Sequence, residues 1–503
     1  MDELIQKYQA VRDKMLAYRF ASFIISWDSQ TEAPSGSFEA RAKHVGILSE
    51  ESYKFSTSQE TIDLINQLYE KRSELDDVLR YEIQEAKTSI EKLKKVPMHE
   101  FVEYMSLLAQ SENIWAKAKN NNDWASFEPI LEKIVAFLRK YIVYIETPKL
   151  KGYDVLLDEY EKGMTMKEYD KFFDTIKTDL VPFVKEVTSR ELEYNNSFEE
   201  IPFPIEKQKE FMDYIMKVMD YDLSRGLMKE SEHPFTSGMG TTDVRVTNHY
   251  YEDNFISSIF SGIHELGHAT YEQQVDPKLD STLSGGGGSM ALHESQSRFY
   301  ENIIGRSLEF WKIHYPALKE IFKKELRGIK VTDFYKHINK STRSLIRTEA
   351  DELTYPIHIM IRYDIEKALF NNEIEVKDLP KVWNQKVKEY LDIDVPSDKE
   401  GVLQDVHWSG GSFGYFPTYA LGSAYASQMF NVMNKDFKVL KSLESKTTKE
   451  INTWFKEKLH KYGASMEPKK LFENCVGGKF NPKHYVKYLI KKYSKIYKIE
   501  KIH

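Results

Sequence analysis

The sequence predicts a mainly helical fold with a small β-sheet at most, and three observations support this prediction. Apolar residues recur at intervals of three and four in well-separated parts of the chain, which is the spacing of one helix face. Strand-like alternation is scarce. The 503 residues are 41% hydrophobic and 13% aromatic, enough apolar material for a large core. Because no repeat, low-complexity tract or Pro/Ser-rich linker divides the chain, we expect residues 1–503 to form one domain of helical lobes.

Three segments show the helical spacing most clearly. One begins the chain, one lies between Pro129, a favoured helix-entry residue, and Pro148, which cannot continue a helix, and one ends the chain. Their apolar positions are Leu4, Tyr8, Val11, Met15 and Tyr18; Leu131, Ile134, Val135, Leu138 and Ile142; and Val486, Leu489, Ile490, Tyr493 and Tyr497. Lysines repeat every four residues from Lys483 to Lys495, and we interpret them as a solvated outer face.

Two shorter segments interrupt the helical pattern. From Thr241 to Thr247, Val244 and Val246 alternate with polar residues, which predicts a strand and a small sheet. The run from Ser284 to Ser289 reads SGGGGS. Glycines can cradle phosphates, but no Gly-Lys-Ser/Thr follows and no strand clearly precedes. We therefore interpret this run as a mobile connection.

Composition excludes several classes of function. The 71 Lys and Arg against 78 Asp and Glu give a net charge of -7, which offers no general attraction to nucleic acid or anionic lipid. The single cysteine, Cys475, cannot form an intramolecular disulfide, and the N-terminus resembles no export signal. Nowhere do about 18 apolar residues run together, as a membrane helix requires. We expect a cytoplasmic protein with neither a nucleic-acid nor a membrane partner.

The segment from His264 to His268 reads HELGH and indicates a metal site. The four-residue spacing places both imidazoles on one helix face, about one turn apart, so that both can bind one ion. Glu265 lies beside them, where its carboxylate can take a proton from a bound water and pass it to a leaving amine. The preceding apolar residues suit a rigid helix that carries a metal.

A third ligand is expected downstream, because a catalytic zinc has three protein ligands and one open position. The metzincin motif H-E-x-x-H-x-x-G-x-x-H does not fit, since Tyr271 stands at its glycine position and Gln274 at its third-histidine position. We favour Glu294, on a predicted second helix beyond the glycine run, over His293. The alternative is that Glu294 only pairs with Arg298 four residues later.

Several further motifs are arranged around the HELGH segment. They are His233-Pro234-Phe235, Asp243-Val244-Arg245-Val246-Thr247, His293-Glu294-Ser295-Gln296, Ile346-Arg347-Thr348-Glu349-Ala350-Asp351 and the segment from Gly401 to Trp408, GVLQDVHW, with Trp27-Asp28 and residues 153–165 upstream. In these motifs the chain resembles the carboxypeptidase Taq family of metallocarboxypeptidases, helical gluzincins similar in architecture to neurolysin and angiotensin-converting enzymes. It departs from the family pattern at Ala291, where a glycine is expected, and at Lys162, where a proline is expected. Neither change removes a chemical group.

The resemblance implies roles for the residues around the metal. His264, His268 and Glu294 would bind one divalent ion per chain, zinc in the first place, with cobalt and manganese as alternatives. Glu265 would activate water for attack on the scissile carbonyl. A second oxyanion donor is wanted, and the candidates are Tyr419 first, by analogy with related helical peptidases, then Tyr415 and His233. The alternative for either tyrosine is a packed ring with a satisfied hydroxyl.

An exopeptidase must also recognise the free carboxylate of its substrate, and arginine suits this task because its guanidinium donates two parallel hydrogen bonds. Arg347 is the family-matched candidate, and the alternative for it is an ion pair with Asp351. Arg245 is the second candidate, with a structural ion pair as an equal alternative. Two further residues, His407 and Gln404, are expected to line the primed pocket, with Asp405 either in the site or orienting His407.

The resemblance therefore implies a neurolysin-like body of two helical lobes with a deep groove and a small sheet near the metal. We expect the metal-site region at 233–298 and substrate-binding segments at 346–351 and 401–422. The expected activity is hydrolytic release of C-terminal residues from peptides with a free C-terminus. The resemblance also implies broad specificity, poor release of proline and a homodimer. The alternatives are a metallo-oligoendopeptidase, which does not need Arg347, and a non-catalytic helical scaffold, which would not need Glu265.

Overall fold

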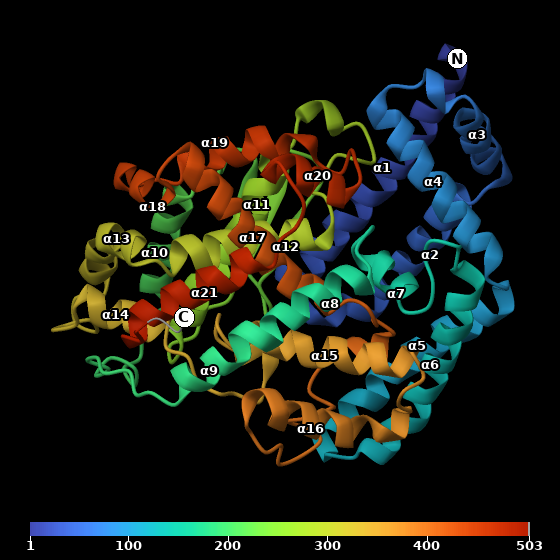
Figure 1. The fold of residues 1–503 in the computed structure, drawn as a ribbon. Helices are drawn as coiled ribbons and strands as arrows, with labels where there is room; N and C mark the ends of the chain where they lie inside the picture. The colour runs from blue at the N-terminus through green and yellow to red at the C-terminus, as the bar shows by residue number, and fades with distance from the viewer. Residues whose placement is uncertain (501–503) are drawn as a thin grey trace. The chain divides into compact units, whose positions relative to one another are not determined.

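The computed structural model describes residues 1–500 and is mainly helical, with one three-stranded sheet (Figure 1). The chain forms two compact units. Unit 1 comprises residues 1–93, 195–335 and 429–478, and unit 2 comprises residues 94–194, 336–428 and, of the described residues, those from 479 onward. The predicted fold class is confirmed. Across residues 1–500, none of the helices combines the length and the apolar character needed to cross a bilayer.

Unit 1 consists of helices and the sheet. Its helices are α1 (Asp2–Thr31), α2 (Phe38–Ser56), α3 (Gln59–Glu70), α4 (Asp77–Lys95), α10 (Ile205–Val218), α11 (Phe255–Gln273), α12 (Met290–Arg298), α13 (Leu308–Ile321), α14 (Val331–Ile338), α18 (Val439–Ser442), α19 (Lys449–Lys458) and α20 (Pro468–Val476). Two of them, α4 and α14, extend a few residues into unit 2, and a third helix, α17 (Pro417–Asp436), passes from unit 2 into unit 1.

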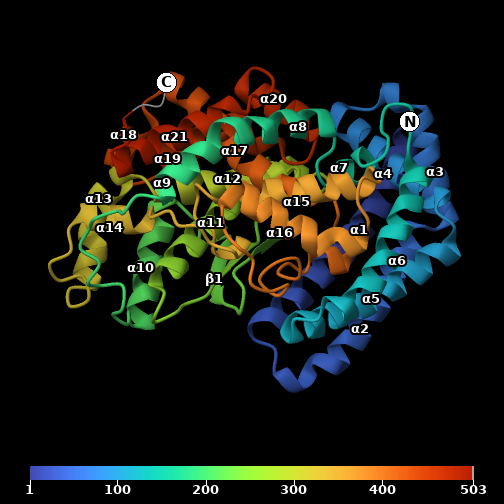
Figure 2. The same ribbon diagram turned by 60° about the horizontal axis from the view of Figure 1, so that its bottom comes forward.

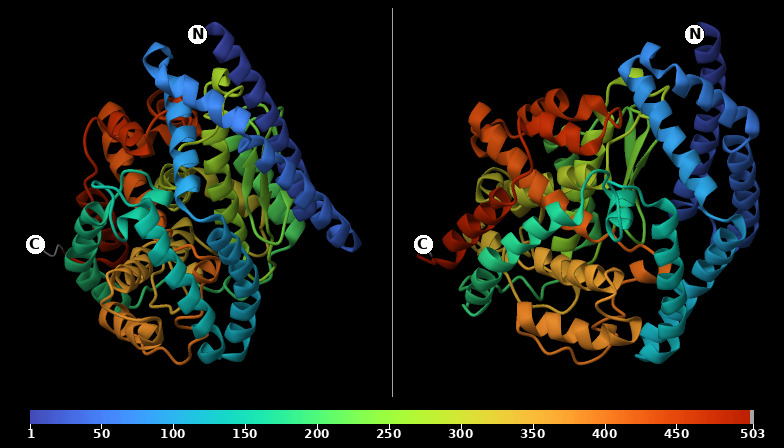
Figure 3. Two further views of the ribbon diagram at one scale, coloured as in Figure 1. Left: turned by 90° about the vertical axis from the view of Figure 1, so that its right-hand side faces the viewer. Right: turned by 45° about the vertical axis from the view of Figure 1, so that its right-hand side comes forward.

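The sheet lies against the helix that carries the HELGH segment. Its strands are β1 (Gly226–Glu230), β2 (Thr236–Gly238) and β3 (Val244–Asn248), in the order β1-β3-β2. Strand β3 runs parallel to β1 and antiparallel to β2, with Thr236 opposite Val246. Val244 and Val246 in β3 are fully buried, as predicted, but the alternation ends there, because Thr247 and Asn248 are fully buried too. Figure 2 shows the sheet beside α11, which packs against β2 and β3, and Figure 3 shows α1 running alongside the strands.

Unit 2 is helical. Its helices are α5 (Met98–Asn121), α6 (Trp124–Ile145), α7 (Asp154–Tyr160), α8 (Met166–Thr175), α9 (Val181–Thr188), α15 (Tyr355–Phe370), α16 (Leu379–Leu391) and α21 (Lys483–Tyr497). The apolar stripe predicted in α6 is buried. The helix begins at Trp124, earlier than Pro129, because the Asp123 side chain accepts a hydrogen bond from the Ser126 amide and so caps the N-terminus of α6. In α21 the row of lysines is exposed, as predicted.

Candidate metal centre and substrate-binding residues

Helix α11 presents the two histidines of the HELGH segment on one side. The helix begins after Asn254, whose side chain accepts a hydrogen bond from the Ser257 amide. The apolar residues Ile259, Ile263 and Leu266 are buried and fix the helix in the core. These contacts hold the axis of α11, so the imidazoles that project from it are placed by the packing of the helix.

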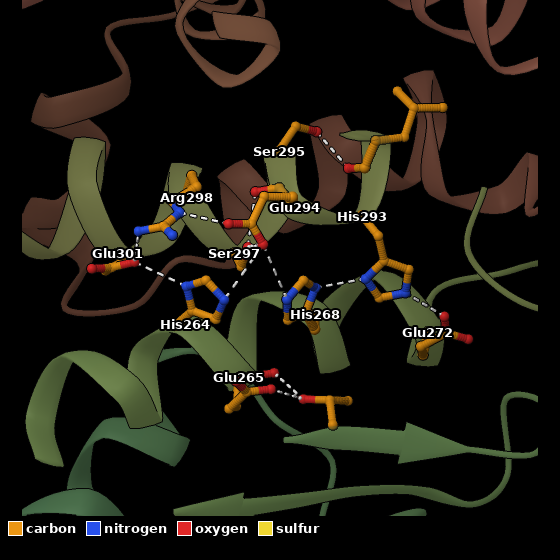
Figure 4. Close-up of polar contacts among 12 residues, drawn as sticks. His264, Glu265, His268, Glu272, His293, Glu294, Ser295, Ser297, Arg298 and Glu301 are labelled. Carbon is orange, nitrogen blue, oxygen red and sulfur yellow. Dashed lines mark hydrogen bonds and ion pairs between the residues drawn. The ribbon is translucent and has the colours of Figure 1, made fainter. Parts of the chain in front are cut away.

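Glu294 is brought to the histidines by helix α12. Its Oε2 lies 3.6 Å from His264 Nε2 and 3.7 Å from His268 Nε2 (Figure 4). The two helices approach closely at Gly267, where an added Cβ would lie 2.8 Å from the Cα of Ser297. The glycine inside the HELGH segment thus has a structural reason: a side chain there would push α12 away from α11.

These three residues fit a divalent ion. One ligand atom from each lies within 4.8 Å of the others, and within residues 1–500 this is the one such group of His, Cys, Asp and Glu. Donors about 2.1 Å from a tetrahedral zinc stand about 3.4 Å apart, close to the separations seen. Two imidazoles and a carboxylate are the donor set of a catalytic zinc site, which leaves a fourth position for water or substrate.

A charged network holds the three candidate ligands in place. Glu294 Oε1 accepts a hydrogen bond from Arg298 Nε at 2.7 Å, which leaves Oε2 facing the histidines. The pairing of Glu294 with Arg298 is therefore present, and it leaves the second carboxylate oxygen available to serve as the predicted ligand. His264 Nδ1 lies 2.9 Å from Glu301 Oε2, and Arg298 Nη1 donates to the same oxygen at 3.2 Å. A carboxylate on the far nitrogen of a ligand histidine fixes its tautomer and orientation.

Glu265 points from α11 toward the sheet. Thr236 Oγ1 on β2 lies 2.8 Å from Glu265 Oε2 and 2.8 Å from the Glu265 carbonyl oxygen, and its single proton can serve either. The carboxylate is 8% exposed, and burial raises the pKa of Glu265, whereas His264 and Thr236 oppose the rise. Thr236 was missed by sequence reasoning because a lone threonine after the HPF motif carries no signal of its own.

The other two candidates in unit 1 are Arg245 and His233. Arg245 forms a bidentate pair with Asp243, with both contacts at 2.7 Å, and its guanidinium lies over the rings of Phe23 and Trp27. The structure therefore bears out the structural ion pair for Arg245. His233 is exposed, and its backbone carbonyl accepts a hydrogen bond from Ser231 Oγ.

Arg347 lies in a buried cluster in unit 2. Its Nε and Nη2 both lie 3.0 Å from Asp405 Oδ1, and its Nη1 lies 3.2 Å from the Tyr355 hydroxyl. Arg362, on α15, pairs with the other oxygen of the same carboxylate at 2.6 Å. One carboxylate thus faces two guanidiniums, so the cluster keeps one positive charge in excess. The charges of Arg362 and Arg347 outweigh burial and hold the pKa of Asp405 well below its usual range.

Two of the alternatives that the sequence left open are not borne out in this cluster. Asp351 does not pair with Arg347: it accepts hydrogen bonds from the amides of Thr342, Leu353 and Thr354 and so shapes the turn into α15. Asp405 does not orient a histidine but holds the guanidiniums. Sequence reasoning missed Arg362, which lies in the apolar segment YPIHIMIRY. A single arginine in a helix is ordinarily expected on the surface, and this segment carries no further signal.

The remaining unit 2 candidates gather around Arg347. Gln404 Oε1 accepts hydrogen bonds from the Arg347 amide and from Arg362 Nη2. His407 Nε2 lies 3.3 Å from the Tyr419 hydroxyl, and the Tyr415 and Tyr419 rings meet edge to face at 5.1 Å. Burial lowers the pKa of His407 to about 4, so its imidazole is neutral near pH 7. Sequence motifs around residues 347 and 404–419 thus mark one cluster.

Comparison with known proteins gives the family. The carboxypeptidase Taq (M32) metallopeptidase family matches residues 7–493. Carboxypeptidase 1 of Bacillus subtilis (strain 168) is 42% identical over 95% of this chain and 96% of its own. Thermostable carboxypeptidase 1 of Thermus thermophilus is 33% identical over 94% and 95%. The crystal structure of the M32 carboxypeptidase from Deinococcus radiodurans R1 has a TM-score of 0.94 at 29% identity, covering 99% of this chain and 100% of its own. The chain therefore belongs to the carboxypeptidase Taq (M32) family of metallopeptidases.

Proposed function

We propose that His264, His268 and Glu294 bind the catalytic metal ion of this protein and that Glu265 is its general base. As a member of this metallopeptidase family, the chain is a metal-dependent carboxypeptidase that hydrolyses peptide bonds. The observation that carries the assignment of residues is the convergence of three ligand atoms within 4.8 Å, with the second oxygen of Glu294 already held by Arg298. We propose one ion per chain, zinc in the first place, because two histidines and one glutamate suit it.

The residues of unit 1 can perform the proton transfers of peptide hydrolysis. When bound, a divalent ion polarises the scissile carbonyl and makes water more acidic. Glu265 takes the proton of the attacking water and later delivers it to the leaving amine. Thr236 holds one Glu265 oxygen, so that the carboxylate keeps one orientation for both transfers. Arg298 keeps Glu294 Oε2 turned toward the histidines.

We assign recognition of the terminal carboxylate to Arg347. The cluster around it holds two guanidiniums and one carboxylate, and the excess positive charge suits an anionic ligand. Gln404 and His407 support the same pocket. For the oxyanion we keep Tyr419 as the first candidate, followed by Tyr415 and His233; Arg245 is the second candidate for the carboxylate.

The remaining proposals concern the substrates, the location and the assembly of the protein. We propose peptides with a free C-terminus as substrates, broad specificity with poor release of proline, a cytoplasmic location and a homodimer. Nucleic acid and membranes are not expected partners. The single domain of two lobes on either side of a groove also stays a prediction.

Digestion of an unbiased peptide pool by the zinc-loaded protein tests the activity. Mass spectrometry should show ladders that shorten from the C-terminus one residue at a time. The Glu265→Gln protein, loaded and treated identically, is the matched control and should leave the pool intact. Internal cuts by the wild-type protein would replace the proposal by an oligoendopeptidase, and an intact pool would favour the scaffold.

A further inference from the structure

The two ligand histidines differ in what holds their far nitrogen. His264 Nδ1 faces a carboxylate, whereas His268 Nδ1 lies 2.6 Å from the Nδ1 of another histidine, His293. His293 Nε2 in turn lies 2.6 Å from Glu272 Oε1 (Figure 4). We call this chain of three side chains, Glu272, His293 and His268, the relay. It begins one turn beyond His268 on α11 and passes through α12 before returning to the ligand.

The positions of the protons in the relay follow from its contacts. Two ring nitrogens 2.6 Å apart share one hydrogen, so either His268 or His293 donates. A ligand histidine must keep the lone pair of Nε2 for the ion, which places the His268 hydrogen on Nδ1. His293 Nδ1 is then the acceptor, so the hydrogen of His293 lies on Nε2. The Glu272 carboxylate, which can only accept, receives it.

We propose that Glu272 is a positioning residue that sets the tautomer of the metal ligand His268 through His293. The inference rests on the proposed metal site for its consequence and on the hydrogen-bond contacts for its mechanism. A donor at position 272 would reverse the chain, because His293 would then carry its hydrogen on Nδ1 and His268 would carry its own on Nε2, facing the ion. The acceptor oxygen of Glu272, acting through His293, therefore decides whether His268 can bind metal.

The glycine run, which we expected to be a mobile connection, covers the relay. The Gly287 amide donates to Glu272 Oε1 at 2.9 Å, and the Gly288 amide donates to the Tyr271 hydroxyl at 2.9 Å. An added Cβ at Gly287 would lie 2.5 Å from His293 Cδ2, 2.7 Å from His293 Nε2 and 2.9 Å from Glu272 Oε1. Only glycine lets the backbone approach the imidazole and complete the contacts of Glu272. The run thus packs against Glu272 and His293, two of the three side chains of the relay.

The tautomers of the metal-free protein test the mechanism directly. Long-range ¹H–¹⁵N correlation spectra of protein labelled at histidine distinguish hydrogen on Nδ1 from hydrogen on Nε2. His268 should carry hydrogen on Nδ1 and His293 on Nε2, with each signal assigned by its loss in a His268→Gln or His293→Gln protein. The opposite tautomers in the wild-type protein would overturn the proposal, whether or not the protein binds metal.

Zinc affinity tests the consequence. The dissociation constant for zinc alone, measured by competition with a chromophoric chelator, should rise about 10- to 100-fold in Glu272→Leu, whose side chain has no acceptor. Glu272→Met, whose thioether is a weak acceptor, should show a smaller rise. Glu272→Gln keeps an acceptor oxygen and should stay within about threefold of the wild-type protein. Equal affinity in Glu272→Leu, with its thermal unfolding unchanged, would sink the proposal. Failure of the wild-type protein itself to bind zinc would instead reject the proposed metal site. In that case the tautomers of His268 and His293 would still test the proposed role of Glu272.

Two neighbouring glycines give a matched pair. Gly287→Ala pushes a methyl group onto His293 and should weaken zinc binding about tenfold. Gly286→Ala, whose added Cβ meets nothing nearer than Glu272 Oε2 at 3.6 Å, should leave zinc affinity unchanged. Equal effects of the two substitutions would show that the run acts on the site through loop stiffness rather than through the relay.

Discussion

Glu294 and Glu265 carry the same carboxylate group in different surroundings. Substitution of Glu294 should therefore weaken zinc binding, whereas substitution of Glu265 should lower the catalytic rate. In Glu294→Gln, an amide that keeps its oxygen toward Arg298 turns its nitrogen toward the histidines, so zinc retention should fall. In Glu265→Gln, zinc content should stay near the wild-type value while kcat falls by several orders of magnitude, because no base remains. Zinc content by atomic absorption and kcat on one peptide measure both.

The two variants are each other's control. Loss of zinc from both proteins to the same extent would mean that Glu265 is a ligand, and full zinc with full activity in Glu265→Gln would place the base elsewhere.

The proposed role of Arg347 is recognition of the free C-terminus of the substrate. Arg347→Ala should lower kcat/KM for a peptide acid about 30-fold to several thousand-fold, the usual cost of removing one partner of a buried charge pair. The wild-type protein should cleave the matching peptide amide far more slowly, whereas Arg347→Ala should treat acid and amide nearly alike. Rates for both substrates with both proteins give the result.

Undiminished preference for the acid in folded Arg347→Ala would move the carboxylate site elsewhere. Arg245 would be the next residue to test, although its guanidinium is already held by Asp243.

Among the elements, the short edge strand β2 connects the sheet to the metal helix through Thr236. Thr236→Val removes the hydroxyl at nearly constant shape and should lower kcat about tenfold, the value of one hydrogen bond of about 1.4 kcal/mol. Thr236→Ser keeps the hydroxyl and should stay within about threefold. KM and zinc content should not change in either protein, and a rise in KM alone would mean that Thr236 contacts substrate instead.

Helix α13 contains a buried group that couples stability to pH. Burial lowers the pKa of His314 to about 4 from 6.5, and its Nδ1 lies 2.8 Å from the Tyr214 hydroxyl. The unfolded chain therefore binds more protons between these values, so stability is present above pH 6.5 and is lost as pH falls toward 4. Relative to His314→Gln, the wild-type protein should lose about 2 kcal/mol between pH 7.5 and 5 in urea unfolding. A constant difference between the two proteins would show that folding leaves the pKa of His314 unchanged.

The elements that could be predicted are those with a long local pattern. The stripes in α6 and α21 span several turns and are largely buried, so these packing faces follow from spacing alone. In α1 only Tyr8 of the predicted stripe is buried, because this helix packs also through Arg12, Phe23 and Trp27. Strands β1 and β2 were not predicted, because β2 has three residues and both depend on pairing with β3, which no local pattern records.

The same division holds for the site. His264, Glu265 and His268 lie within one turn of helix, and motif spacing marks Glu294 and Arg347. Their supports could not be found in this way. Glu301, Arg362 and Glu272 reach their partners only after helices have packed, and a glutamate or arginine in a helix is by itself an ordinary surface residue.

For the molecule as a whole, metal should govern both activity and stability. Removal of metal by a chelator should abolish hydrolysis, and added zinc should restore it. At a free zinc concentration about 100 times the dissociation constant, zinc should also stabilise the fold by about 2.7 kcal/mol. Thermal unfolding and peptide hydrolysis measured on the same samples report both. Full activity in rigorously metal-free protein would end the assignment of the metal centre.

Each of the two units takes three separate stretches of the chain, and this interleaving bears on how the protein is made. Unit 1 needs residues 429–478 and unit 2 needs residues that follow 478, so neither unit can finish folding before synthesis has passed residue 478. At about 5 to 20 residues per second, synthesis from residue 93 to residue 478 takes about 20 to 80 seconds. Helices α1, α3 and α4 can bury part of their apolar surface against one another during this time, but their contacts with the later stretches of unit 1 must wait. Chaperones that shield nascent chains should therefore matter more for this protein than for one whose domains follow one another along the sequence.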